Sequence, residues 1–186
     1  MTVAAFVAGR PLTVAEVEER LAALRAGPFA ARLPHPATAE GRNLRRWLVQ
    51  VLTAEAVLDH EARARGLAGD GRLPRTALDL GAALRLGGVA AAVLAVHPHG
   101  PALHAAVTAA VTVPAAEARA YYDRNRDRYP SEYPEARPAV TELLLAAARD
   151  RAFGRWLDER CAALVRLRPG YEHPGDPSQP DYAHHH

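Results

Sequence analysis

Apolar residues recur every three or four positions over most of the chain, which predicts amphipathic helices. The first predicted helix begins at a capping box, Thr13 to Glu16, and ends near Arg25 because Gly27 and Pro28 follow it. A further helix is expected to begin at Pro101. Longer helices are predicted over about residues 39–65, 75–96, 115–129 and 138–164. The residues expected to be buried in the last helix are Val140, Leu143, Leu144, Ala147, Phe153, Leu157, Cys161 and Leu164.

Two short segments near the ends of the chain have extended patterns. Residues 3–7 form a strand candidate, followed by a predicted turn at Gly9-Arg10-Pro11. Residues 165–168 alternate in polarity and are expected to pair with residues 3–7. We therefore predict an all-α fold with one short two-stranded element. It comprises a helical domain over residues 1–169 and an extended tail, residues 170–186, packed on or beside that domain.

Composition and charge narrow the function classes. The chain has 186 residues and is 49% hydrophobic, which favours a single domain with a core of alanine, leucine and valine. All 23 basic residues are arginines, interleaved with 21 acidic residues for a net charge of +2. This pattern lacks the basic patch that nucleic-acid binding requires. The single cysteine, Cys161, excludes an internal disulfide and is expected to be a buried core thiol.

The chain carries no pattern typical of a targeting or membrane-spanning segment. Its first residues lack the basic start and long apolar run of a signal peptide. The most apolar window, residues 78–96, contains Asp79 and Arg85, so a buried helix fits it better than a membrane span. We therefore predict a cytoplasmic protein that binds neither nucleic acid nor a membrane.

The tail concentrates metal-ligating side chains in a segment that prolines keep from being helical. Imidazole and carboxylate groups bind copper, zinc, iron and nickel. The candidate ligands in the tail are His173, His184, His185 and His186. The candidates for acid/base chemistry or a further ligand are Asp176, Asp181 and Tyr182. Two interpretations stay open: a native metal site, or a solvated tail whose last histidines are a purification-tag remnant.

A second histidine group offers partners for the tail. His97 and His99 flank a proline in a predicted loop, and His104 lies one turn into the helix that begins at Pro101. Three imidazoles within eight residues could converge at a helix start and join a metal site with the tail histidines. The alternative is ordinary loop polarity.

Three stretches in order resemble the peptide-binding domain of the SurA/PpiC-type parvulin chaperones. Residues 7–18 resemble the family's opening strand, turn and first helix. Residues 113–129 resemble the helix before the isomerase module, and residues 151–159 resemble the closing helix. The resemblance implies a helical scaffold with a hydrophobic cradle for a peptide. Only residues 130–141 stand where the family carries its isomerase module, so the resemblance implies no prolyl isomerase activity.

These observations support two main hypotheses of function. The first is a metal-dependent enzyme of specialised metabolism that acts on a small molecule at a histidine-rich site. The alternative is a cytoplasmic chaperone-like module that binds a peptide or protein in an apolar groove. A metal-independent enzyme is a third hypothesis, for which spacing identifies no residue set. No glycine-rich phosphate loop indicates a nucleotide cofactor, and homodimer formation stays open.

Overall fold

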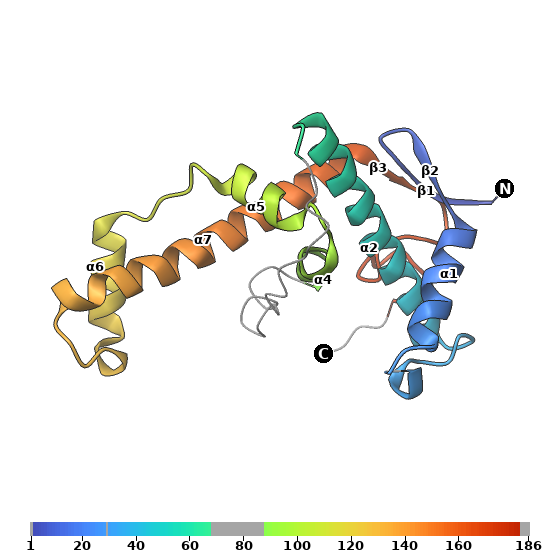
Figure 1. Ribbon diagram of the computed structural model, residues 1–186. Helices are drawn as coiled ribbons and strands as arrows, with labels where there is room; N and C mark the ends of the chain where they lie inside the picture. The colour runs from blue at the N-terminus through green and yellow to red at the C-terminus, as the bar shows by residue number, and fades with distance from the viewer. Residues whose placement is uncertain (1, 29, 68–87, 183–186) are drawn as a thin grey trace.

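The computed structural model describes residues 2–28, 30–67 and 88–182. Its longest element is helix α7 (Tyr133–Leu164), which runs along much of the molecule (Figure 1). A small sheet with helices α1 (Val14–Arg25) and α2 (Ala39–Ala64) lies at the C-terminal end of α7. Helix α6 (Ala115–Arg124) packs at the other end, so the molecule is elongated.

The sheet has three antiparallel strands in the order β2-β1-β3. The predicted pairing of the two chain ends is confirmed, because β1 (Val3–Val7) pairs with β3 (Val165–Leu167). The all-α prediction with a two-stranded element was wrong in detail, since the predicted turn at Gly9-Arg10-Pro11 largely belongs to a further strand, β2 (Arg10–Thr13).

The extra strand follows from a tight hairpin between β1 and β2. Ala8 and Gly9 both have positive φ, 47° and 80°, as the two central residues of a type I′ turn require. Pro11 then falls in an edge strand, where the missing N–H of proline is tolerated. Sequence reasoning treated Pro11 as a turn signal and therefore missed β2.

Helix α1 begins at the predicted capping box. The Thr13 hydroxyl accepts a hydrogen bond from the Glu16 N–H at 3.2 Å, and the Glu16 carboxylate accepts one from the Thr13 N–H at 2.7 Å. The 3₁₀ turn Ala30–Arg32 follows, and Thr38 caps α2 through the N–H of Gly41. A side chain at Gly41 would collide with the His35 carbonyl, so the entry into α2 requires glycine.

Helix α2 is the centre of the core, because it is buried on two sides. One side packs with the sheet and α1, through Val49 against Ala5 and Val17. The other side packs against helices α4 (Gly88–Val96) and α5 (Gly100–Thr108) and the second half of α7. The predicted helix over residues 75–96 lies partly outside the described residues, and α4 is its described part.

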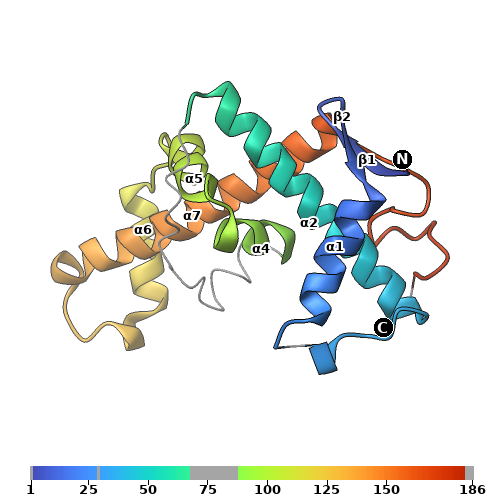
Figure 2. The same ribbon diagram turned by 45° about the vertical axis from the view of Figure 1, so that its right-hand side comes forward.

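The far end of the molecule is an arm, residues 113–144, with its own small core. Helix α6 lies beside the first part of α7 (Figure 2). Ala118 and Tyr122 of α6 pack against Ala136 and Val140 of α7. Helix α6 is shorter than predicted and is followed by the 3₁₀ turn Arg126–Arg128. Helix α7 begins five residues earlier than predicted, at Tyr133 instead of Pro138. Leu143 was expected to be buried but is 44% exposed, whereas its neighbour Leu144 packs against the small core of the arm.

Candidate functional site

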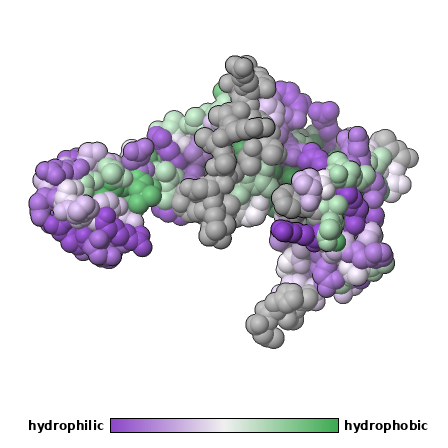
Figure 3. Space-filling model, turned by 60° about the horizontal axis from the view of Figure 1, so that its bottom comes forward, coloured by the Kyte–Doolittle hydropathy of each residue, from purple (hydrophilic) through white to green (hydrophobic). Residues whose placement is uncertain are grey.

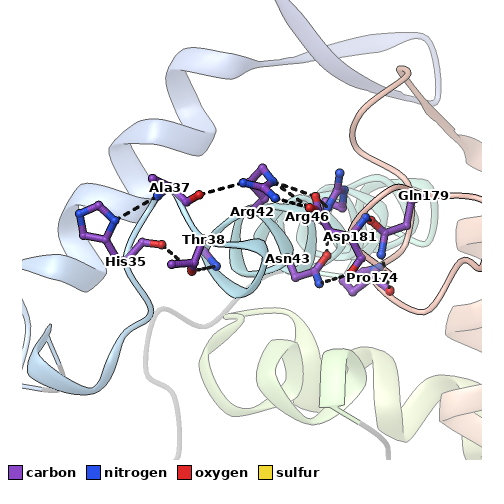
Figure 4. A network of polar contacts seen from close by, with 10 residues as sticks. His35, Ala37, Thr38, Arg42, Asn43, Arg46, Pro174, Gln179 and Asp181 are labelled. Carbon is purple, nitrogen blue, oxygen red and sulfur yellow. Dashed lines mark hydrogen bonds and ion pairs between the residues drawn. The ribbon is translucent and has the colours of Figure 1, made fainter. Parts of the chain in front are cut away.

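The described part of the tail, residues 170–182, is held against α2 by an ion-pair cluster (Figure 4). The Asp181 carboxylate accepts hydrogen bonds from Arg42 Nε at 2.9 Å and from Arg46 Nη1 at 2.7 Å. Asn43 donates a side-chain hydrogen bond to the Asp181 carbonyl at 3.1 Å. Arg46 is nearly fully buried. We call this arrangement of Arg42, Asn43, Arg46 and Asp181 the tail anchor.

The tail anchor determines what Asp181 can do. Hydrogen bonds from Arg42 and Arg46 hold the pKa of Asp181 well below its usual range. The carboxylate therefore stays ionised and engaged, and general acid/base work or metal ligation would first have to break these ion pairs. Its present role in the structure is to fix the tail.

Turns within the tail engage the side chains of Asp176, Gln179 and His173. Asp176 accepts hydrogen bonds from the N–H and hydroxyl of Ser178, which lower its pKa. Gln179 is buried and donates to the Pro174 carbonyl at 3.0 Å. The His173 Nδ1 accepts a hydrogen bond from the Gly175 N–H at 3.0 Å. When neutral, the exposed His173 ring therefore carries its proton on Nε2.

The last predicted tail candidates are placed only in part. Tyr182 donates its backbone N–H to the Gln179 carbonyl at 3.2 Å, one residue after the tail anchor. His184, His185 and His186 lie outside the described residues. The anchor is thus the last described fixed point before them.

The second histidine group is divided between two carboxylates. His97 Nε2 and His99 Nε2 lie 3.3 and 3.9 Å from Asp59 Oδ1, with ring centroids 5.7 Å apart. His104 Nε2 lies 3.2 Å from Asp150 Oδ1, and its ring packs on Phe153. The fold therefore brings His97 and His99 together and gives His104 a different partner.

The Asp59–His97 contact has the properties of a structural hydrogen bond. His97 is buried, and its Nδ1 accepts a long hydrogen bond of 3.3 Å from the His99 N–H. Nε2 therefore carries the proton of the neutral ring and faces Asp59 as a donor. Burial lowers the pKa of His97 despite the nearby carboxylates of Asp59 and Glu55, which keeps the ring neutral near pH 7. Metal ligation through Nε2 would require the other tautomer and would break the bond from His99.

The tail anchor and the His97–His99 pair contact α2 at points far apart along the helix. The tail anchor contacts Arg46 and the His97 ring contacts Asp59, and both partners belong to α2. Thirteen residues of helix separate them, which is about 20 Å at 1.5 Å per residue. Within residues 2–28, 30–67 and 88–182, no three His, Cys, Asp or Glu side chains are already arranged to hold a metal ion.

A cavity lies beside His173, between the tail and four elements of the domain. Its volume is about 300 Å³. We call it the tail cavity, and its lining residues are Gln50 and Thr53 of α2, Val89 of α4, Asp158, Cys161 and Ala162 of α7, Val165 and Leu167 of β3, and His173. Cys161 is half-buried, and burial raises the pKa of its thiol to about 11, so it is a protonated thiol at neutral pH.

Comparison with known proteins reaches only the beginning of the chain. Residues 3–40 match the model of a family of unknown function, DUF7158. This stretch holds β1, β2, α1 and the entry to α2, and it ends before Arg42 and all the candidate ligands. No curated protein and no solved structure matches the chain. No described helix combines the length and apolar character needed to cross a membrane.

Sequence reasoning missed the residues that organise both histidine groups. Asp59 and Arg46 lie on a helix whose polar positions resemble those of any amphipathic helix, so neither is marked by spacing. Their partners are 38 and 135 residues away in the chain. A buried arginine at a core position of α2 is the one available signal, and it becomes visible only once the buried faces are known.

Proposed function

We propose that this protein binds a transition-metal ion through histidines of its tail and acts as a metal-dependent enzyme on a small molecule. The observation that supports this most is the tail anchor, which fixes residues 170–182 on α2 through a nearly buried arginine. A tail that is only solvated would not be expected to pair with a nearly buried guanidinium group, because burying an arginine is costly unless it is paired. An anchored tail, in contrast, limits the entropy that its histidines lose when they gather around one ion.

The carboxylates of the tail already have partners, which favours its histidines as the metal ligands. Its carboxylates are engaged, Asp181 by two arginines and Asp176 by Ser178. His173 is exposed, although ligation through its Nε2 would require the other tautomer and would break the hydrogen bond from the Gly175 N–H, and the three terminal histidines add further imidazoles. Copper, zinc, nickel and iron all accept imidazole ligands. A site with an open coordination position would activate water, dioxygen or a heteroatom of a bound substrate.

Elemental analysis of untagged protein tests this proposal. We expect stoichiometric copper, zinc, iron or nickel in the full chain, and its loss from a chain that ends at Gly170. A His97→Ala/His99→Ala double variant is the matched control and should keep its metal. The proposal fails if the full chain binds no transition metal after reconstitution. It also fails if the double variant, and not the truncated chain, loses the metal.

A chaperone-like module is the second candidate function, and the surface of the arm favours it. Leu143 is 44% exposed, and Figure 3 shows hydrophobic surface on the side of the otherwise hydrophilic arm. Helix α7 also carries an open cavity on a different face from Leu143, lined by Pro134, Arg137, Pro138, Thr141, Glu142 and Leu145. The test is suppression of aggregation of an unfolded client protein. Suppression that is lost in Leu143→Asp would support this candidate, and no suppression by the wild-type chain would exclude it.

A further inference from the structure

We propose that the tail cavity is a binding site for a small organic cation, specifically a primary amine with an apolar body. His173 lines the cavity and is also a proposed metal ligand, so the inference concerns the metal-free protein and rests on the charge and shape of the cavity, not on a bound metal. A volume of about 300 Å³ is at the lower end of the range for small-molecule sites. The cavity is formed by α2, α4, α7, β3 and the tail together, so its shape depends on how these five parts pack against one another.

The charge of the lining selects for a cation. Asp158 supplies a carboxylate, and no arginine is among the described lining residues, although the chain holds 23 arginines. Asp158 takes part in no ion pair or hydrogen bond with the described residues, unlike Asp59, Asp123 and Asp181. A carboxylate that has no ion-pair partner among the described residues favours a positively charged ligand and disfavours an anionic one.

The environment of Asp158 points in the same direction. The side chain is on the whole exposed, yet the surrounding protein removes part of its water and raises its pKa. A bound ammonium group would restore the lost stabilisation of the ionised form. The neutral Cys161 thiol next to it adds no positive charge.

The other polar groups of the cavity offer acceptors that suit an ammonium group. Gln50 donates its amide hydrogen to the Tyr171 carbonyl at 3.3 Å, which leaves its side-chain oxygen as an acceptor. Thr53 donates its hydroxyl hydrogen to the Gln50 carbonyl at 3.0 Å and keeps its lone pairs. Val89, Val165 and Leu167 supply the apolar wall for the ligand body.

Three probes of nearly equal size separate charge from shape: benzylamine, benzyl alcohol and benzoate. They are titrated at pH 7 into metal-free, chelator-treated protein, and binding is followed by calorimetry or NMR. We expect benzylamine to bind at least about threefold more tightly than benzyl alcohol, the range of a partly exposed ion pair, and benzoate to bind most weakly. Equal affinities for the amine and the alcohol, or no binding of benzylamine, would overturn the proposal.

A pair of adjacent variants assigns the preference to one carboxylate. Asp158→Asn should abolish the difference between benzylamine and benzyl alcohol, whereas Glu159→Gln, next to it on α7 but outside the cavity, should preserve it. Benzylamine should also slow alkylation of Cys161 in the wild-type chain, because the thiol lines the same cavity. An amine preference that survives Asp158→Asn would place the cation elsewhere and refute the site.

Discussion

The two histidine groups both combine imidazoles with nearby carboxylates, but the carboxylates have different partners in the two groups. In the group around residues 97–104, carboxylates engage the imidazoles: Asp59 faces His97 and His99, and Asp150 faces His104. In the tail, arginines and a serine engage Asp181 and Asp176 instead, and His173 forms no ion pair with a described carboxylate. The comparison teaches that the number of histidines in a segment says less about metal binding than what its carboxylates are paired with.

The largest expected effect is release of the tail from α2. Asp181→Asn removes the ion pairs with Arg42 and Arg46 and leaves the nearly buried Arg46 without its counter-ion. We expect limited proteolysis between residues 170 and 182 to become at least about tenfold faster, since an uncompensated buried charge favours the open form. Arg45→Gln is the control, because Arg45 pairs with Glu18 at the surface and should leave the cleavage rate unchanged. An equal cleavage rate in Asp181→Asn and wild type would mean that the anchor does not hold the tail.

Acidification should weaken the anchor in a defined pH window. The pKa of Asp181 is depressed in the folded state, so its contribution is fully present above the unfolded-state value near 4 and is lost progressively as the pH falls from there through the depressed folded-state pKa. The tail should therefore stay protected between about pH 5 and 8 and become progressively more accessible as the pH falls below about 4. Hydrogen exchange of the residue 171–182 amides measures this. Loss of protection between pH 7 and 5 would point to a histidine instead.

The pairing of the other group predicts a moderate loss of stability. His97→Ala removes a buried ring and its hydrogen bond to Asp59, with an expected cost of about 1–3 kcal/mol in the free energy of unfolding. Urea denaturation measures the change. If His97→Ala leaves stability unaltered while metal is lost, His97 is a ligand and not a structural residue.

A smaller effect is expected at His104, whose bond to Asp150 is partly exposed. His104→Ala should cost about 1 kcal/mol or less, most of it from the lost contact with Phe153. The ratio of the stability losses in His97→Ala and His104→Ala tests the role of burial, because both histidines form a hydrogen-bonded contact with a carboxylate and only His97 is buried. A cost at His104 larger than the cost at His97 would contradict the burial argument.

Local signals predicted much of the fold. The capping box placed α1, the alternation of residues 165–168 placed β3, and helical periodicity placed α2. These predictions were correct because each rests on a pattern among residues that are close in the sequence. Strand β2 was missed because Pro11 belongs to an edge strand, a position that only the topology reveals.

The candidate sites were much less accessible to sequence reasoning. The grouping of His97 with His99 was expected. The partners Asp59 and Arg46 were not, because the contacts His97–Asp59 and Arg46–Asp181 each join residues that are far apart in the sequence. The tail cavity combines four elements and the tail, and no local pattern indicates that Asp158 forms no ion pair with the described residues. Long-range pairing decides which titratable groups are available, and spacing along the chain does not encode it.

The most direct test of the central claim is paramagnetic resonance of the copper(II)-loaded protein with two chain ends. The full chain is compared with a chain that ends at Tyr182, which keeps the tail anchor and lacks His184, His185 and His186. We predict nitrogen couplings from imidazole in the full chain and their reduction or loss in the shortened one. The account would be contradicted if the full and shortened chains gave identical spectra and only the His97→Ala/His99→Ala variant gave a different one. That result would place the metal near Asp59.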